Sequence, residues 1–182
     1  SRRKSLCYYS IRYPFVFLEV ARRQVVRRAD AREMGFIADE SVDLVLSHPP
    51  YMNIIRYSEP AVEGDISAIG SMWKFCDAME ALAQELLRVL KAGRYCAILI
   101  GDTRRGWHYV PLAFNVMRRF LRAGFVLKED IIKVQHNTMS RSRWIGKAKG
   151  KGFYLIMHEH LFVFRKPEAG EDLSRIRYSR GQ

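Results

Sequence analysis

The sequence predicts an α/β sandwich built on a mostly parallel sheet, from three observations. Two short runs of β-branched and apolar residues, at 42–46 and 95–100, have the length of buried strands. Between them, residues 72–90 repeat apolar side chains at spacings of three and four, which marks one face of a helix. Strand and helix then continue to alternate, and this order predicts helices packed against a largely parallel sheet.

The elements follow one another in a regular order. The run at 42–46 is followed by two prolines, so we expect a strand that ends in a loop. The helix over 72–90 and a second helix over 111–121 are each closed by an Ala-Gly pair. Late strands are expected at 125–134 and within 153–164. Because no helix is expected between them, they predict an antiparallel pair at one edge of the sheet.

One domain is expected, over residues 29–167. A poorly defined N-terminal segment at 1–28 precedes it, and a polar, frayed tail at 168–182 follows. No apolar run approaches the roughly 20 residues that span a bilayer. No apolar stretch of signal-peptide length follows the basic start of the chain. These features predict a cytoplasmic protein with no membrane partner, and they leave the oligomeric state open.

The sequence predicts no metal site. Its three cysteines form neither an even framework nor a CxxC pair, which argues against a disulfide scaffold and a structural zinc site. His158 and His160 are expected to share one face of a late strand, with Glu159 on the other face. No third ligand is spaced to complete a site with the two histidines, so we expect them to have packing roles.

The charge indicates a polyanionic partner. Thirty-one Lys and Arg against 19 Asp and Glu give a net charge of +12, which suits nucleic acid. A solubilising surface or attraction to a membrane surface is the alternative. Part of the excess lies in a predicted basic loop at about 136–152, which contains no acidic residue. This loop is suited to phosphate contacts and stacking, or is only a solvated loop. The candidate nucleic-acid-binding residues are Arg141, Arg143, Trp144, Lys147, Lys149 and Lys151.

The motif with the clearest chemistry is His-Pro-Pro-Tyr at 48–51, directly after the first strand. Ligands of such folds bind beyond the carboxyl ends of the strands. Two adjacent prolines fix the backbone and leave carbonyls free to accept hydrogen bonds, and Tyr51 can stack on a planar base. Acceptors that hold the hydrogens of an exocyclic amine orient its lone pair. The turn therefore suits methyl transfer to such an amine.

Residues 43–51, DLVLSHPPY, resemble the catalytic motif of the DNA N4-cytosine/N6-adenine amino-methyltransferase family, a strand followed by (Asp/Asn/Ser)-Pro-Pro-(Tyr/Phe). Segments at 29–43, 88–95 and 158–167 also resemble that family, in the expected order. The resemblance implies a Rossmann-like methyltransferase sandwich. It further implies S-adenosyl-L-methionine as cofactor and DNA as partner and substrate, with cytosine or adenine as the target base.

The resemblance also implies roles for the motif residues. Pro49 and Pro50 shape the turn, and Tyr51 stacks on a flipped base. The alternative for Tyr51 is a half-buried aromatic residue in a turn. His48 stands where the family has Asp, Asn or Ser, and its neutral imidazole can accept a hydrogen from the amine. Ser47, one position earlier, is the alternative acceptor.

A second set of residues is implied in cofactor binding. Asp30 and Ala31 match the acidic turn before the motif, where Asp30 would accept hydrogen bonds from the adenosine part of the cofactor. Ser47 and His48 complete this cofactor-binding edge. The alternative for Asp30 is a helix cap at the surface.

One departure from the family pattern is large. The Gly-rich turn of the Phe-x-Gly-x-Gly kind, which the family places against the methionine end of the cofactor, has no counterpart in the sequence. We therefore expect an incomplete sandwich, a fragment or trimmed variant of the domain. An amino-methyltransferase of RNA or protein stays open as an alternative. So does a non-catalytic nucleic-acid-binding module derived from a methylase.

Overall fold

The computed structural model describes residues 25–58, 62–136 and 141–181. The predicted segment at 1–28 therefore lies almost wholly outside the described residues. The helices and strands are β1 (Val42–Ser47), η1 (Ile66–Ala68), α2 (Met72–Val89), β2 (Leu90–Ile100), β3 (Thr103–Arg105), β4 (His108–Val110), α3 (Leu112–Ala123), β5 (Val126–Val134), α4 (Arg141–Lys151), β6 (His158–Arg165) and η2 (Ser174–Ser179).

Four strands form the main sheet in the order β1-β2-β6-β5. β1 and β2 are parallel, and β6 is antiparallel to both of its neighbours. Three of the four strands thus run in one direction, which confirms the predicted α/β class. The predicted antiparallel pair is also confirmed as β5 with β6, although helix α4 lies between them in the chain.

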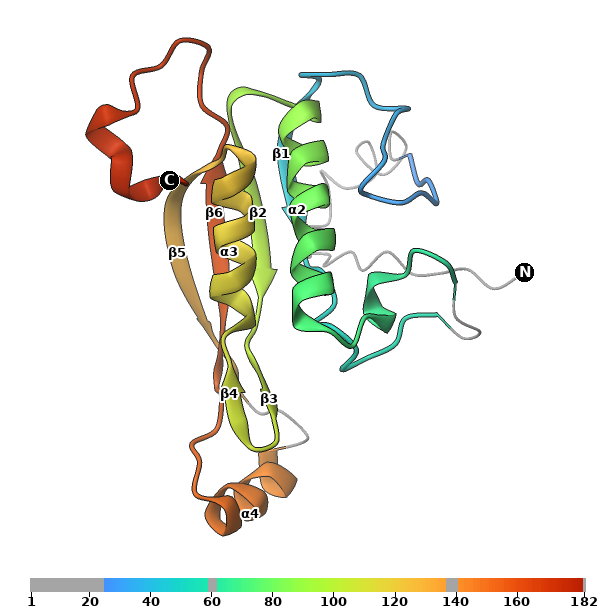
Figure 1. The fold of residues 1–182 in the computed structure, drawn as a ribbon, viewed down its shortest axis with the longest axis vertical. Coiled ribbons are helices and arrows are strands. Elements are labelled where there is room, and N and C mark those ends of the chain that lie inside the picture. The colour runs from blue at the N-terminus through green and yellow to red at the C-terminus, as the bar shows by residue number, and fades with distance from the viewer. Residues whose placement is uncertain (1–24, 59–61, 137–140, 182) are drawn as a thin grey trace, which may run out of the picture.

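The helices α2 and α3 lie side by side over one face of the sheet (Figure 1). The core between them and the sheet includes Phe75 and Met79 of α2, Phe120 of α3 and Phe164 of β6, all fully buried. The rings of Phe120 and Phe164 stack with centroids 4.8 Å apart. No helix in the described part of the chain is long and apolar enough to cross a membrane.

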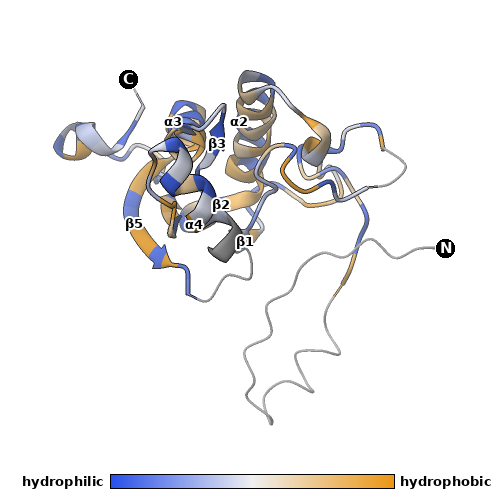
Figure 2. Ribbon diagram, turned by 90° about the horizontal axis from the view of Figure 1, so that it is seen from below, coloured by the Kyte–Doolittle hydropathy of each residue, from blue (hydrophilic) through white to orange (hydrophobic). Residues whose placement is uncertain are grey.

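The prediction that β1 is a buried strand is only half right. Val42 and Val45 pack against the core, whereas Leu44 and Leu46 are 55% and 72% exposed. β1 is an edge strand, and α2 and α3 cover only one face of the sheet. The opposite edge strand, β5, carries polar and apolar segments in succession (Figure 2).

The junction between α2 and β2 differs from the expected one. The helix ends at Val89, and the strand begins at Leu90 rather than near residue 95. Leu90 has an extended backbone and pairs with Val42 of β1. Gly93, at a φ of 73°, takes up the left-handed bend within the long strand, which few other residues adopt without strain.

The lower end of the molecule was not predicted correctly. The hairpin β3–β4 was not expected, and the basic loop contains the helix α4 (Figure 1). The hairpin and the segment after α4 are joined by Phe153, whose ring stacks on Trp107 at 6.2 Å and lies 4.4 Å from the Arg104 guanidinium. These contacts replace the strand expected at 153–157, so only residues 158–165 join the sheet.

The C-terminal tail contacts the sheet. It forms the 3-10 turn η2, and Arg180 makes an isolated bridge to Val126 of β5. The guanidinium of Arg165 donates to both carboxylate oxygens of Glu171, at 2.8 and 2.5 Å. This bidentate pair fixes the tail to the end of β6.

Candidate active site

The His-Pro-Pro-Tyr turn is anchored in the molecule. Ser47, the last residue of β1, pairs with Ile98 of β2. Pro49 and Pro50 are buried, and the chain then turns through Met52, which is 2% exposed and has a φ of 56°. The rigid diproline turn expected from the sequence therefore lies at the carboxyl end of a strand, with its prolines packed against the protein.

The ring of Tyr51 is held by side chains from distant parts of the chain. Its hydroxyl donates to Glu159 Oε1 of β6 at 2.5 Å. His48 Nε2 lies 2.9 Å from the same hydroxyl oxygen. Lys133 Nζ of β5 donates to Glu159 Oε2 at 2.6 Å. The turn is thereby connected to β6 and, through Glu159, to β5.

This arrangement assigns the tautomer of His48. A carboxylate only accepts hydrogen bonds, so the single proton of the Tyr51 hydroxyl lies in the hydrogen bond to Glu159. The hydroxyl oxygen can then only accept from His48, which places the imidazole hydrogen on Nε2. Nδ1 of the neutral ring is left with a lone pair, and the residue as a whole is exposed.

Burial and charge favour these protonation states. Burial of the His48 ring lowers its pKa below the usual range, although Glu159 attracts a proton to it. Burial also raises the pKa of Tyr51, and the hydrogen bond to Glu159 adds to that effect. Burial disfavours the charge on Glu159, but hydrogen bonds from Lys133 and Tyr51 outweigh it and lower the pKa of this carboxyl. Near neutral pH, a neutral His48, a neutral Tyr51 and an ionised Glu159 coexist.

Gly101, directly after β2, makes room for the Tyr51 ring. A Cβ at this position would lie 2.9 Å from Tyr51 Cε2 and 3.4 Å from Glu159 Cγ. The first distance is shorter than a normal carbon–carbon contact, so any other residue would displace the ring. The close approach of ring and strand end thus depends on glycine.

A cavity of about 420 Å³ opens beside this network. Its walls come from Tyr51, residues 101–104 after β2, the segment 155–159 leading into β6, and Trp144 of α4. This volume lies in the range of small-molecule sites. A larger hollow of about 530 Å³ runs along α4 and residues 152–155 but has no wall from the turn. We therefore assign the candidate site to the smaller cavity.

The structure brings part of the predicted basic segment to this cavity. Trp144 lines it, while Lys147, Lys149 and Lys151 are exposed on α4. Lys147 Nζ lies 5.1 Å from the centre of the Trp144 ring, and Lys151 Nζ lies 5.6 Å from that of Trp107. The side chains of Arg141 and Arg143 lie outside the described residues.

Comparison with known proteins places the chain in a family. The family model described as DNA methylase matches residues 42–182. The chain belongs to the DNA methylase family. No curated protein sequence matches the chain significantly.

Solved structures share the fold of this chain. A protein from Thermus thermophilus described as a DNA modification methylase is 22% identical, with a TM-score of 0.56, over 79% of this chain and 54% of that one. The same protein was crystallised in complex with S-adenosyl-L-methionine. The PvuII DNA methyltransferase, described as cytosine-N4-specific, is 19% identical, with a TM-score of 0.59, over 85% of this chain and 53% of that one. The chain spans about half the length of these structures.

The residues predicted to contact the adenosine part of a cofactor precede β1, and Asp30 is paired with Arg32. Asp30 Oδ1 accepts from the Arg32 backbone N–H at 2.9 Å, and both carboxylate oxygens accept from the Arg32 guanidinium. These hydrogen bonds lower the pKa of Asp30. No hydrogen bond or ring contact of the described residues joins Asp30 or Ala31 to the turn. Their role in cofactor binding stays a prediction.

Sequence reasoning missed three members of the site, Gly101, Lys133 and Glu159. Each lies at or near the end of a strand, and these strand ends lie at the same end of the sheet as the turn. Glu159 carried the best signal, since it was expected to face away from its two histidine neighbours. The residues that contact Glu159 could not be predicted, because the register between two strands cannot be read from the sequence of one of them.

Proposed function

We propose that this chain carries the catalytic turn of an S-adenosylmethionine-dependent enzyme that methylates an exocyclic amino group of a base in DNA. The observation that carries the proposal is the buried diproline turn, with Tyr51 tied at 2.5 Å to Glu159 beside a cavity of about 420 Å³. Membership of the DNA methylase family supports the same reaction.

The cavity suits a base that has left the helical stack. Tyr51 and Trp144 supply aromatic surface on its walls, and Asp102, Arg104 and Gln135 supply polar groups. Enzymes that modify a base in a duplex take it out of the stack and hold it between such groups. Tyr51 is fixed through its hydroxyl, so little further ordering of its ring is needed when a base binds.

The chemical demand on the protein is orientation of a weak nucleophile. The lone pair of an exocyclic amine is delocalised into the ring of the base. His48 Nδ1 and the diproline carbonyls are the acceptors that we assign to the amine hydrogens, so that the nitrogen lone pair turns toward the methyl group. The nitrogen–methyl bond would form as the sulfur–methyl bond of the donor breaks, leaving S-adenosylhomocysteine. The amine would then lose a proton, and His48 Nδ1 is the atom that we assign to accept it. The reaction has no covalent enzyme intermediate, so positioning accounts for most of the catalysis.

The residues at the end of β1 fit one end of the cofactor. Ser47 and His48 offer polar groups beside the turn, at the strand end where α/β folds bind ligands. When bound, S-adenosylmethionine supplies an electrophilic methyl group on sulfur. Asp30 fits the adenosine end less well, because Arg32 already occupies both of its carboxylate oxygens. Ser47 and the backbone of His48 are therefore the groups of this chain that we assign to the cofactor, because the ring nitrogens of His48 already serve Tyr51 and the amine.

DNA is the substrate that the charge favours. Lys147 of α4 lies next to Trp144, which lines the cavity, and phosphates flanking a displaced base would approach there. The net charge of +12 adds long-range attraction.

The test is methyl transfer from radiolabelled S-adenosylmethionine to duplex DNA by the full chain, with nucleoside mass spectrometry to identify N4-methylcytosine or N6-methyladenine. RNA of the same sequence runs in parallel. Tyr51→Ala should abolish transfer, while Tyr178→Ala, at an 84% exposed position, should leave it unchanged.

Calorimetry with S-adenosylhomocysteine separates the alternatives. If the chain binds the cofactor but methylates only RNA, then RNA and not DNA is the substrate. DNA binding without any cofactor binding or transfer would overturn the enzymatic proposal and favour a non-catalytic nucleic-acid-binding module. Cofactor binding must be measured directly because the chain spans only about half the length of the solved structures that it resembles.

A further inference from the structure

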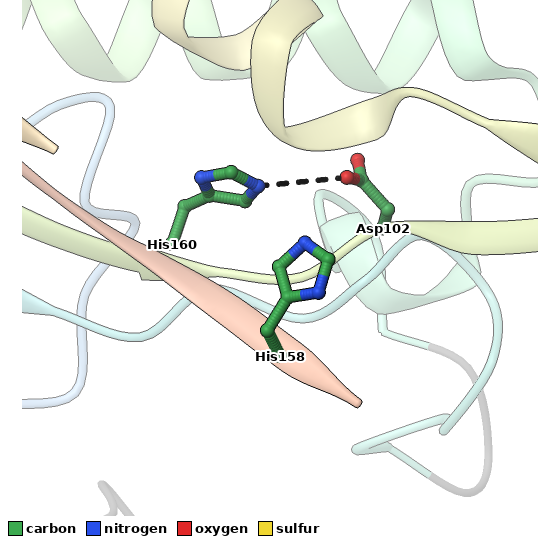
Figure 3. Close-up of side chains that lie close together, drawn as sticks. All are labelled: Asp102, His158 and His160. Carbon is green, nitrogen blue, oxygen red and sulfur yellow. Dashed lines mark ion pairs between the residues drawn. The ribbon is translucent and has the colours of Figure 1, made fainter. Parts of the chain in front are cut away.

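A cluster of metal-ligating side chains lies where β2 ends and β6 begins. Asp102 follows β2, and His158 and His160 project from one face of β6 (Figure 3). One ligand atom from each residue lies within 4.8 Å of the others. The sequence predicted that no third ligand accompanies the two histidines, but the pairing of β2 with β6 brings Asp102 to them.

The ring of His160 is buried and only half satisfied. The residue is 4% exposed. Its Nδ1 lies 3.0 Å from Asp130 Oδ1, whereas its Nε2 is buried and has no hydrogen-bond partner among the described residues. Nε2 points at Asp102 Oδ2 from 3.8 Å (Figure 3). Buried polar atoms are nearly always paired, so this one calls for an explanation.

Asp102 is a buried carboxyl group whose hydrogen bonds come from neutral groups. Its side chain is 0% exposed. Oδ1 accepts from the Ala113 backbone N–H at 2.8 Å, and Oδ2 accepts from the Tyr109 hydroxyl. A buried carboxylate is stable when a positive charge lies near it. The gap between Oδ2 and His160 Nε2 is too long for a hydrogen bond, but a cation between the two atoms would satisfy both.

The spacing matches a transition-metal ion. Zinc binds imidazole nitrogen and carboxylate oxygen at about 2.0–2.2 Å, so two ligand atoms on one ion lie at most about 4.4 Å apart. The 3.8 Å between Asp102 and His160 falls within this limit. The widest separation in the cluster, 4.8 Å, closes with a small rotation of His158, which is only half-buried.

We propose that Asp102, His158 and His160 bind one divalent transition-metal ion, of the zinc or cobalt kind. Two imidazoles and one carboxylate are a ligand set for these metals. Metal-ligating histidines usually donate the hydrogen of their other ring nitrogen to a carboxylate or carbonyl group. Asp130 is such a carboxylate for Nδ1 of His160, so the Nε2 lone pair would point at the ion. The proposal does not rest on the proposed methyl transfer.

The ion would lie beside the candidate active site. Asp102 and His158 both line the cavity of about 420 Å³. Three protein ligands leave a fourth position of a tetrahedral ion to a water or to another molecule. This ion would thus join the end of β2 to β6 next to the cavity.

The experiment uses the full chain, treated with chelator and then titrated with Co²⁺ and Zn²⁺. Visible absorption bands of cobalt report tetrahedral coordination, and calorimetry with Zn²⁺ gives stoichiometry and affinity. We expect one equivalent to bind. His160→Phe should abolish binding, and Asp130→Asn should weaken it by about 10–100-fold. His108→Gln, at an exposed histidine outside the cluster, is the matched control and should bind like the parent chain.

Two further readouts keep the proposal open to refutation. Circular dichroism of each metal-free variant shows whether it is folded; if His160→Phe unfolds, His158→Gln replaces it. Nitrogen-15 spectra of the histidine rings show which nitrogens change on adding Zn²⁺. Absence of cobalt bands, or equal zinc affinity in the cluster variants and His108→Gln, would overturn the proposal. So would spectra in which His160 carries a hydrogen on both nitrogens in the presence of zinc, because a proton would then bridge Asp102 and Asp130.

Discussion

His48 replaces the acid, amide or serine of the family motif, and this makes its protonation state decisive. The Tyr51–Glu159 hydrogen bond fixes the imidazole hydrogen on Nε2, and partial burial favours the neutral ring. The proposed acceptor is the lone pair on Nδ1, which disappears when the ring is protonated. The substitution is compatible with catalysis as long as His48 stays neutral.

This leads to a prediction for the pH dependence of methyl transfer. The pKa of His48 is lowered from its usual 6.5, so the active neutral form persists below that pH. The single-turnover rate should fall as the pH drops through the lowered pKa, and so at a lower pH than an ordinary histidine would give. His48→Asn, whose amide oxygen accepts at any pH, should remove this acid limb. An acid limb that is unchanged in His48→Asn would refute the assignment.

Gly101 provides a second test at the residue scale. A Cβ at this position would lie 2.9 Å from Tyr51 Cε2, so Gly101→Ala should push the ring out of place without unfolding the chain. A displacement of about 1 Å near the reacting groups can cost about 100-fold in rate. We therefore expect a loss of that order in single-turnover methyl transfer.

The matched control for this test is Gly35→Ala, since nothing lies within 4 Å of a Cβ at Gly35. It should transfer methyl groups like the parent chain. If Gly101→Ala also retained full activity with an intact circular dichroism spectrum, the close packing of Tyr51 would have no catalytic importance.

At the scale of elements, α4 is the clearest departure from the sequence-based expectation. Residues 141–151 contain two glycines and five basic residues, a composition that favours a solvated loop. The helix is held instead by contacts that a local pattern does not reveal, such as Trp144 with Phe153 at 6.4 Å. It carries Lys147, Lys149 and Lys151 on a regular scaffold next to the cavity.

If α4 contacts DNA phosphates, replacing its lysines should change the salt dependence of binding. The triple variant Lys147→Gln, Lys149→Gln and Lys151→Gln should bind duplex DNA more weakly whatever the sequence. The slope of log affinity against log salt should fall by roughly 0.9 for each phosphate that the variant no longer neutralises. Fluorescence anisotropy at several salt concentrations measures both effects.

A triple variant of equal charge change controls for net charge alone. Lys74, Arg118 and Lys128 are exposed on α2, α3 and β5, and their replacement by Gln removes the same three charges. Equal slopes in the two triple variants would mean that α4 contributes only long-range attraction.

The elements that the sequence predicted well are those whose patterns are local. The apolar spacing of α2 and α3 placed both helices to within a few residues, and β1, β2 and β5 were found near their expected positions. The diproline turn was also predicted, because proline restricts the backbone by its own covalent structure. Long-range pairings were missed, namely Tyr51 with Glu159 and Asp102 with His160. The short hairpin β3–β4, a local pairing, was missed as well.

For the whole molecule, the fold class was predictable but the burial of its surfaces was not. An apolar run such as 42–46 indicates a strand buried on both faces only if helices cover both sides of the sheet. Here α2 and α3 cover one face, so Leu44 and Leu46 are exposed while Val45 is packed. Stability must therefore come mainly from the single layer between these helices and the sheet.

The last prediction concerns a core residue in that layer. Phe164 is fully buried on β6, pairs with Cys96 of β2 and stacks on Phe120 of α3, so it joins both parts of the core. Phe164→Ala should lower the free energy of unfolding by about 3–5 kcal/mol, because it removes buried ring surface and leaves a cavity. Urea unfolding followed by circular dichroism measures the change. Tyr154→Ala, at a 93% exposed aromatic, should stay within about 0.5 kcal/mol of the parent chain. A similar effect of the two substitutions would mean that the face covered by α2 and α3 is not the main source of stability.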